Sequence, residues 1–421
     1  MSASYSPVDA AGLIAILAGL PDVEVRLGGA PAGWQVREVG DGNLNLVFIV
    51  EGPAGGLVVK QALPYVRLVG ESWPLPLERS WFEYNALVEQ ARYAPRLVPK
   101  VFHFDRALAM IVMEYLSPHV IMRKGLTRGV EYPRFAADIA EFLAATLFNT
   151  SVLAGAAAAH KRRIELFARN VELCRITEDL IFTDPYRGAP LNRWTSPHLD
   201  ADKRAFEADS ALKVAAQARK YQFLTAAQAL VHGDLHTGSI MLTAEDTRVI
   251  DPEFAFVGPM GFDVGAVIGN LLLAYFAQEG HEPAPHARDA YRAWILAQVV
   301  AVWTGFHDRF LALWRQAKGG EAYDRDLFPS PQDQAALDAE RARFLRSLFE
   351  DTLAFGGLKM IRRILGLAHV EDLESIADPA RRAICERKAL RLARMLVVDA
   401  AKFAAVAAVV EAAQRQALPL G

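Results

Sequence analysis

The sequence predicts an α+β protein of two lobes, with residues 1–116 rich in strands and residues 117–421 mainly helical. In the first quarter of the chain, short apolar or alternating runs are separated by glycine-containing turns, which is typical of antiparallel strands. From about residue 131 onward, apolar residues recur at helical spacing in alanine-rich sequence. Hydrophobic residues make up 52% of the 421 positions, which is enough for a sizeable core.

Five strands and one helix are expected in the N-terminal lobe. The first two strands, at residues 34–39 and 44–50, flank an Asp-Gly turn, which is a strong hairpin signal between two such runs. The other expected elements are strands at residues 57–62, 101–104 and 108–115 and a helix at residues 78–90. Together these elements predict a five-stranded antiparallel sheet with one helix.

The C-terminal lobe is expected to consist of long helices, interrupted by two short strands near residues 239–242 and 247–250. The expected helices cover residues 135–150, 154–174, 201–225, 262–278, 287–318, 332–355, 357–365 and 381–417. The most apolar stretch, residues 264–276, contains Asn270 and is too short to span a bilayer comfortably, so we expect a buried helix there.

The overall charge gives no reason to expect nucleic acid or an anionic membrane as the main partner, since 46 Lys and Arg against 49 Asp and Glu leave a net charge of −3. Cys174 and Cys385 form neither a metal-binding spacing nor a disulfide framework, which favours a reducing compartment. The first residues lack the basic region and the long apolar core of a secretion signal. We therefore expect a cytoplasmic protein.

Two acidic motifs carry the clearest chemical signal. Asp234 lies in a His-Gly-Asp loop, and Asp251 and Glu253 follow a short apolar run. In an extended segment, acids two residues apart lie on one face, where their oxygens suit a hard cation such as Mg²⁺. Three converging acids can align a hydroxyl nucleophile and hold metal against a polyphosphate, which predicts a phosphotransferase with Asp234 as base or orienter. A solvated loop is the alternative, but apolar neighbours favour a partly buried site.

Three further residues of these motifs are expected to be structural. His232 and His236 could be metal ligands, but they lie on a turn, so we expect both to hydrogen-bond the loop backbone. Asp263 precedes an uncharged helix, and we expect it to be a buried anchor that binds backbone amides near Asp234.

Residues suited to bind a nucleotide occur at both ends of the predicted sheet. The turn between the first two strands could lay backbone N–H groups over phosphates, although a plain hairpin is the better explanation of so short a glycine motif taken alone. The candidate residues there are Gly40, Gly42, Asn43 and Asn45. Where the last strand ends, the Glu114 carbonyl and the Leu116 amide could pair with an adenine edge, although an ordinary interdomain linker would look the same.

Lys60 lies on an otherwise apolar strand, where a cation must find an anion or reach solvent. It could bind nucleotide phosphates, with Glu83 on the following helix to orient it. Glu78 is a weaker candidate for that role, because an acid at a helix start can simply favour the helix dipole. A solvated lysine on an edge strand is an equally good explanation of Lys60 in isolation.

Arg362 and Arg363 lie in a helical run whose neighbours are largely apolar. Adjacent residues diverge by about 100° on a helix, so the two arginines cannot both lie on one solvated face. At least one should point at an anion or a carboxylate, and a structural ion pair is an equally good explanation.

The order of these features resembles the protein-kinase-like, aminoglycoside-phosphotransferase-like superfamily. The segments that resemble the methylthioribose kinase family more specifically are residues 232–241, 249–256, 258–263 and 360–369 and the tryptophan-containing loop at 64–74. The resemblance spans nearly the whole chain. Ser239 stands where many members of the superfamily have asparagine, and Asp251-Pro252-Glu253 stands where many have Asp-Phe-Gly, so Glu253 could supply the missing metal ligand.

The resemblance implies a bilobal protein-kinase-like fold that binds ATP between its lobes, with Lys60 on the phosphates and Mg²⁺ on Asp251 and Glu253. It further implies that Asp234 aligns the anomeric hydroxyl of 5-methylthioribose for phosphoryl transfer. The pair Arg362 and Arg363 would neutralise the transferring group or hold the sugar. The implied product is 5-methylthioribose 1-phosphate, an intermediate of methionine salvage, and a homodimer is expected by analogy.

Two alternatives stay open. Another small-molecule kinase of the same fold would act on a different sugar, a choline-like alcohol or an aminoglycoside, but the Arg362–Arg363 pair argues against a positively charged substrate. A catalytically inactive nucleotide-binding protein would have no need of Lys60 together with all three acids.

Overall fold

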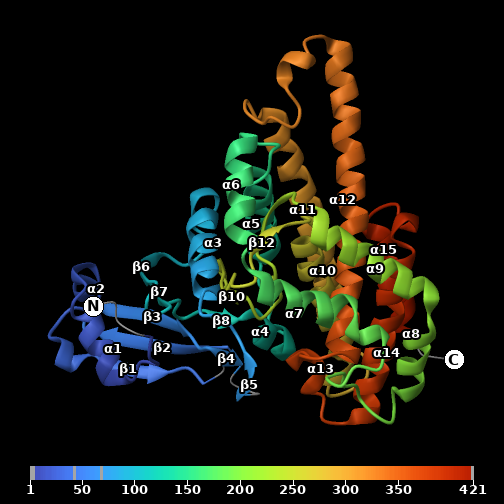
Figure 1. The fold of residues 1–421 in the computed structure, drawn as a ribbon. Helices are drawn as coiled ribbons and strands as arrows, with labels where there is room; N and C mark the ends of the chain where they lie inside the picture. Colours follow the sequence, from blue (N-terminus) through green and yellow to red (C-terminus); the bar gives the residue numbers. More distant parts are fainter. Residues whose placement is uncertain (1–4, 41–43, 67–69, 419–421) are drawn as a thin grey trace.

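The N-terminal strands and most of the helices form two distinct parts of the molecule (Figure 1). The computed structural model describes residues 5–40, 44–66 and 70–418. In Figure 1 the N-terminal sheet lies at the lower left, and the helices extend from the centre to the right, with α11 and α12 projecting upward. This arrangement confirms the predicted α+β fold class, with an antiparallel N-terminal sheet and a mainly helical remainder.

An antiparallel five-stranded sheet forms the N-terminal part, as predicted, with the strand order β1-β2-β3-β7-β6. Its strands are β1 (Gln35–Glu38), β2 (Asn45–Gly52), β3 (Gly55–Ala62), β6 (Val101–Asp105) and β7 (Met110–Glu114). The central strand is β3, and Val59 of β3 and Val112 of β7 are fully buried. The two-stranded ribbon of β4 (Tyr65–Val66) and β5 (Gly70–Pro74) precedes α3 (Arg79–Tyr93).

Two short helices that the sequence analysis did not predict pack against this sheet. They are α1 (Ala10–Leu17) and α2 (Pro21–Leu27), and their leucines join the core of the sheet. Asp9 caps α1 by accepting the Gly12 N–H at 2.8 Å, and a proline starts α2, where a missing N–H has no helical partner to lose. The capping aspartate and the proline are both visible in the sequence. However, helices of 8 and 7 residues are too short to show a clear helical spacing of apolar residues.

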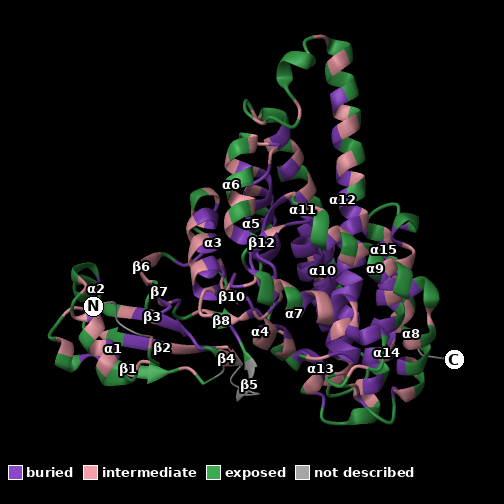
Figure 2. Ribbon diagram, viewed as in Figure 1, coloured by how far each residue is buried: buried purple, intermediate pink, exposed green. Residues whose placement is uncertain are grey.

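The C-terminal part is built around α10 (Gly261–His281). Among the described helices, α10 alone has the length and composition of a membrane span, yet its apolar window is 100% buried inside the protein (Figure 2). The buried helix expected at residues 264–276 is therefore confirmed. The other helices of this part are α4 (Met122–Arg128), α5 (Phe135–Asn149), α6 (Ala157–Phe167), α7 (Val171–Phe182), α8 (Asp200–Ala208), α9 (Ser210–Thr225), α11 (Asp289–Gln316), α12 (Pro331–Leu365), α13 (Glu371–Glu374), α14 (Pro379–Val398) and α15 (Val406–Ala417).

Three predicted helices, at residues 154–174, 201–225 and 381–417, are each two helices in the structure. The first is interrupted at Asn170, whose side-chain amide donates to the backbone carbonyls of Glu253 and Ala255. The second is interrupted at Asp209, whose carboxylate caps α9. Short polar side chains compete with the helix for backbone hydrogen bonds, and helical spacing alone does not reveal that competition.

By contrast, α12 continues through Gly356, where a break between two helices was expected. A Cβ added at Gly356 would lie 2.9 Å from the Gly265 carbonyl oxygen on α10. The glycine is therefore needed for close packing of two helix backbones and does not end the helix. This packing positions the C-terminal half of α12 beside the loop that carries Asp234.

Short strands flank the two loops that carry Asp234 and the segment from Asp251 to Glu253. They are β8 (Val120–Ile121), β9 (Ala229–Val231), β10 (Ile240–Leu242), β11 (Thr247–Val249) and β12 (Phe256–Gly258). The hairpin of β10 and β11 confirms the two predicted short strands. The pairing of β9 with β12 brings together the segment before the His-Gly-Asp loop and the segment after Glu253.

Candidate active site

Asp234 lies on a tight loop after β9, and backbone contacts fix this loop. Gly233 has φ 86°, and a Cβ on it would lie 2.1 Å from the Phe254 carbonyl oxygen, so the loop needs glycine. The carboxylate of Asp263 accepts the backbone N–H groups of His232 and Gly233 at 2.6 and 3.1 Å. Asp263 is thus the buried anchor that the sequence predicted.

His232 connects the two acidic motifs. Its Nε2 lies 2.9 Å from the carbonyl oxygen of Ile250, the residue before Asp251. Because His232 is also two residues before Asp234, this contact holds the Asp234 loop beside the Asp251 segment. The predicted structural role of His232 is confirmed.

Asp234 is surrounded by nitrogen atoms of three side chains. His236 Nε2 lies 3.3 Å from one carboxylate oxygen, and Lys359 Nζ lies 3.5 Å from the other. A guanidinium nitrogen of Arg363 lies 3.7 Å from the oxygen that His236 approaches. Burial raises the pKa of Asp234, but these neighbours lower it more, and the pKa lies well below its usual range. Asp234 is therefore a weak base but a good acceptor with which to orient a hydroxyl group.

His236 does more than the structural task expected of it. Its Nδ1 accepts the Gly238 N–H at 2.9 Å, so a neutral ring carries its proton on Nε2, which faces Asp234. Burial lowers the pKa of His236 to about 4, despite the opposing effect of Asp234. His236 is thus a neutral donor that helps to fix the orientation of the Asp234 carboxylate.

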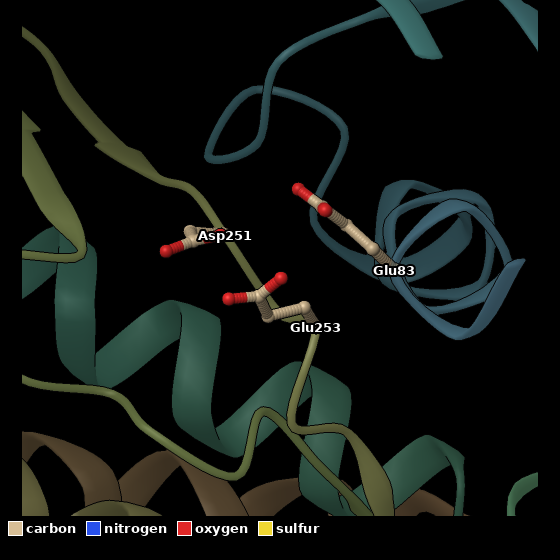
Figure 3. A group of neighbouring side chains, drawn as sticks. All are labelled: Glu83, Asp251 and Glu253. Carbon is tan, nitrogen blue, oxygen red and sulfur yellow. The ribbon is translucent and has the colours of Figure 1, made fainter. Parts of the chain in front are cut away.

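Glu83, Asp251 and Glu253 form an acidic group whose oxygens lie within 4.8 Å of one another. Figure 3 shows Glu83 extending from α3 and the other two acids from the segment after β11. Asp251 has φ 68°, in the left-handed region, so the acids meet through a turned backbone and the expected extended alternation was wrong. The oxygen-only donor set fits Mg²⁺, with Glu83 as an unexpected third acid.

Lys60 extends from the central strand β3 into this acidic group. Its Nζ lies 2.8 Å from Glu83 and 4.0 Å from Glu253, and it also contacts Asp251. Burial lowers the pKa of Lys60, but the three carboxylates raise it more, so Lys60 stays charged. The predicted Lys60–Glu83 pair is present, and the buried central position rules out a solvated lysine on an edge strand.

Arg79 belongs to the same group, and sequence reasoning missed it. It is fully buried in the first turn of α3, and its Nε lies 3.5 Å from Glu253 Oε2. Its guanidinium donates to the Asn45 side chain at 3.2 Å, and Asn45 donates to Glu253 at 3.1 Å. Arg79 and Glu83 are four residues apart and so share a helix face, which is the signal that could have found Arg79.

In the glycine-containing turn between β1 and β2, the structure describes two of the four candidate residues. Gly40 is exposed after β1, and Asn45, the first residue of β2, points to the acidic group. Gly42 and Asn43 lie outside the described residues.

The candidate hinge follows β7. Glu114 ends this strand, and its side chain pairs with Arg248 of β11 at 3.1 Å, which links the sheet to the C-terminal part. Leu116 lies two residues further and is buried.

The two candidate arginines take different positions on α12. Arg363 approaches Asp234, as noted, and also donates to the Ala368 carbonyl at 2.9 Å. This contact with Asp234 confirms the expectation that at least one arginine faces a carboxylate. The buried Nε of Arg362 has no hydrogen-bond partner among the described residues. Lys359, one turn earlier, was not predicted as a site residue. Like Lys60, it is a lysine between apolar neighbours, and such a cation must find an anion or reach solvent.

The chemistry of these two groups is complementary. The acidic group with Lys60 offers a cation for phosphate oxygens and carboxylates for a metal. Asp234 offers an acceptor for a hydroxyl group, and the cations of α12 beside it can compensate negative charge on a group transferred to that hydroxyl. The arrangement suits transfer of a phosphoryl group to an alcohol.

Known proteins similar to this chain are kinases. Residues 35–306 match the model of the "Phosphotransferase enzyme family". Methylthioribose kinase 1 of Oryza sativa subsp. japonica is 48% identical over 409 residues, which are 96% of this chain and 94% of that protein. Methylthioribose kinase of Escherichia coli O45:K1 (strain S88 / ExPEC) is 47% identical over 411 residues, 97% of this chain and 98% of that protein.

Among solved structures, a glucosamine kinase (crystal form B) has a TM-score of 0.43 and 16% identity, covering 92% of this chain and 87% of its own; this similarity is too low to add to the assignment. The sequence relatives match almost from end to end. On that similarity and on the match to the phosphotransferase model, this chain belongs to the methylthioribose kinase family.

Proposed function

We propose that the protein transfers the terminal phosphoryl group of ATP to the anomeric hydroxyl of 5-methylthioribose, giving 5-methylthioribose 1-phosphate for methionine salvage. The substrate is supported by methylthioribose kinases that are 44–48% identical over most of the chain. The observation that carries the chemistry is Asp234, held ionised between donors and next to the cations of α12, beside a separate Lys60–carboxylate group.

In the proposed reaction, Lys60 binds the phosphates of ATP while Glu83 keeps the Lys60 ammonium in place. Asp251 and Glu253, with Glu83 nearby, hold Mg²⁺, which supplies neutralisation of the polyphosphate charge. The backbone at Glu114 and Leu116 borders the adenine.

Asp234 accepts a hydrogen bond from the anomeric hydroxyl and directs its oxygen toward the phosphoryl group. An anomeric hydroxyl is more acidic than an ordinary alcohol, so alignment contributes more than proton abstraction by this weak base. Arg362 and Arg363 compensate the charge of the transferring group. His236 and Lys359 hold the carboxylate in the orientation that this alignment needs.

The test is a coupled ADP-release assay with the purified full chain and methylthioribose, ribose, choline and kanamycin as acceptors. We expect methylthioribose to give the highest kcat/KM, by orders of magnitude over choline and kanamycin. A preference for another acceptor would assign the chain to a different small-molecule kinase activity. Nucleotide binding without turnover of any acceptor would support the inactive binding protein instead.

We also propose that the protein acts in the cytoplasm as a homodimer of two-lobed subunits, with the lobe boundary after Leu116 and with neither nucleic acid nor membrane as a partner. The dimer is supported by family resemblance alone, and the absence of nucleic-acid partners by the net charge of −3. Light scattering coupled to size-exclusion chromatography checks the dimer, and a monomer mass at micromolar concentration would contradict it.

A further inference from the structure

One arginine of the helical part connects the two ends of the candidate hinge. The hinge comprises residues 115–118, between Glu114 of β7 and His119 before β8. A terminal guanidinium nitrogen of Arg248 on β11 lies 3.1 Å from Glu114 Oε2, and Arg248 Nε donates to Asp246 Oδ2 at 2.7 Å. The same Asp246 oxygen lies 3.0 Å from His119 Nε2, which donates because an ionised carboxylate can only accept. Arg248 and Asp246 therefore link the residue before the hinge to the residue after it.

The end of the hinge at Glu114 is also held by the segment between α3 and β6. Glu114 Oε2 accepts the Lys100 N–H at 3.0 Å, and the Glu114 N–H donates to the Lys100 carbonyl at 2.8 Å. The guanidinium nitrogen that meets Glu114 also donates to the Val98 carbonyl at 3.3 Å. The side chain and the backbone of Glu114 are thus both fixed where the chain leaves the sheet.

The other end of the hinge is held by the hairpin of β10 and β11. The strand β8, which begins directly after His119, pairs with β10. The turn of this hairpin is closed by Asp246, whose backbone N–H donates to Thr243 Oγ1 at 3.0 Å. Burial raises the pKa of Asp246, but the hydrogen bonds from Arg248 and His119 lower it more, so Asp246 is ionised at neutral pH.

The contacts of Arg248 need an arginine. A guanidinium group presents its N–H donors in a planar fork, so it can meet two carboxylates and a backbone carbonyl in different directions, whereas an ammonium group is a compact point charge. The side chains of Arg248 and Glu114 are 16% and 27% exposed, so solvent screens their pairing less than it screens a pair on the open surface. Arg248 contacts the side chain of Glu114, whereas the proposed function assigns the adenine to the backbone there.

We propose that Arg248 is a positioning residue for the nucleotide base. It holds the hinge, through Glu114 on one side and through Asp246 and His119 on the other, in the conformation whose backbone receives the adenine. A nucleotide binds only those molecules whose hinge has this conformation, so its apparent dissociation constant is the intrinsic one divided by their fraction. The inference rests on the part of the proposed function that places the base at the hinge, and not on the identity of the acceptor.

The effect of Arg248 is confined to ligands that carry a base. The phosphates are assigned to Lys60 and to a metal ion on the acidic group, which is a set of contacts separate from Arg248. Inorganic tripolyphosphate has the phosphates of ATP without the base, so its binding reports on the phosphate site alone. A general loss of structure would instead weaken the binding of both ligands.

The test is titration calorimetry of the full chain with ADP and with inorganic tripolyphosphate, each with excess Mg²⁺ and without an acceptor. If a free hinge has the binding conformation about a tenth of the time, the dissociation constant of ADP rises about tenfold in Arg248→Met. The dissociation constant of tripolyphosphate should stay within about twofold of that of the wild type, because no hinge contact enters it. Arg248→Lys should restore part of the affinity for ADP, because an ammonium group can meet one of the two carboxylates but not both.

Arg387→Met is the matched control. The Arg387 side chain is 25% exposed, pairs with Asp202 at 3.0 Å and donates to the His198 carbonyl at 2.7 Å, so its removal costs contacts of the same kind as those of Arg248. These contacts join α14 to α8 and the segment before it, within the helical part and away from the hinge. We expect this variant to bind both ligands as the wild type does.

Wild-type affinity for ADP in Arg248→Met would overturn the proposal, as would an equal loss of affinity for ADP and for tripolyphosphate. If Arg248→Met does not fold, Glu114→Gln carries the test with the same expected selective loss of ADP binding and the same contrary outcomes. Its amide oxygen can still accept the Lys100 N–H, while the negative charge that Arg248 meets is lost.

Failure of this inference is distinguishable from failure of the proposed function, because neither titration contains an acceptor. Turnover of methylthioribose together with wild-type ADP binding in Arg248→Met rejects the role of Arg248 alone. Selective loss of ADP binding in that variant, without turnover of methylthioribose by the wild type, rejects the proposed acceptor alone.

Discussion

The individual residue with the clearest predicted effect is Asp234. Replacing it with alanine removes the acceptor that aligns the sugar hydroxyl, and we expect kcat to fall by about 10²–10⁴. ATP binding should persist, because Lys60 and its acidic partners are a separate set of contacts. Fluorescence titration with a nucleotide analogue and the coupled assay measure the two effects. Near-normal turnover, or loss of nucleotide binding in a folded variant, would refute the assigned role.

Lys359 gives the reaction a pH dependence at the alkaline side. Burial lowers the pKa of Lys359 to about 8, with Asp234 and Asp263 opposing that shift and Arg362 and Arg363 adding to it. Because this pKa is depressed, the cation is present below pH 8 and is lost as the pH rises through it. We expect kcat/KM for the sugar to fall about tenfold for each unit of pH above 8. In Lys359→Arg, whose charge persists to far higher pH, the fall should disappear; an unchanged profile would show that another group titrates.

At the scale of residues, the sequence predicted the acidic motifs and the Lys60–Glu83 pair but missed Arg79 and Lys359. The segment from Asp251 to Glu253 was found because two acids after an apolar run are unusual. Arg79 was missed because an arginine at a helix start looks solvated, and only the folded chain shows that it is fully buried against Glu253. His236 was predicted only to hydrogen-bond the loop backbone. Its contact with Asp234 arises because Nδ1 accepts the Gly238 N–H, which leaves Nε2 facing the carboxylate, and the sequence does not show which ring nitrogen makes which contact.

At the scale of elements, the crossing of α10 and α12 determines where the cations of α12 lie. An added Cβ at Gly269 of α10 would lie 2.7 Å from the Gly356 carbonyl oxygen, which is backbone and cannot rotate away. We expect Gly269→Ala to cost about 1–3 kcal/mol of unfolding free energy, measured by urea denaturation, because the helices must separate. Turnover should fall as well, since a displaced α12 moves Lys359 and Arg363 away from Asp234.

Gly155→Ala is the control for this crossing, because a Cβ there meets nothing within 4 Å. We expect it to leave stability and turnover close to those of the wild type. A Gly269→Ala protein as stable as this control would show that the two helices do not need their close approach.

The elements themselves were more predictable than their ends. Periodicity found the sheet and the long helices because burial imposes spacing on apolar residues. It merged α8 with α9 and α14 with α15, since helix formers fill both sides of each break and the capping residues differ little from surface ones. It also predicted a break at Gly356. Without the partner helix, a glycine that allows two helices to cross cannot be told from a glycine that ends a helix.

At the scale of the whole molecule, the nucleotide site depends on both parts of the chain. The sheet has its own buried core, and a far larger core fills the helical part. A small cluster joins them, in which Phe82 of α3 meets Phe167 of α6 with ring centres 6.3 Å apart. One of the polar connections is Lys60, which comes from the sheet and contacts two acids of the helical part. Its removal therefore tests the coupling between the two parts.

Replacing Lys60 with methionine leaves Glu83, Asp251 and Glu253 close together with Arg79 as the remaining cation of the group. Breaking a buried ion pair in this way costs about 3–5 kcal/mol, so we expect a lower Tm in the presence of EDTA. Excess Mg²⁺ should raise the Tm of this variant more than that of the wild type, because no ammonium group competes for the carboxylates. Binding of Mg²⁺ at 100 times its Kd adds about 2.7 kcal/mol to the free energy of unfolding.

Differential scanning fluorimetry measures both shifts in Tm, with Lys100→Met as the control, because Lys100 is an exposed lysine before β6. Equal Mg²⁺ shifts in the variant and the wild type would show that these acids do not form a metal site, and a variant with normal Tm in EDTA would show that Lys60 does not connect the two parts.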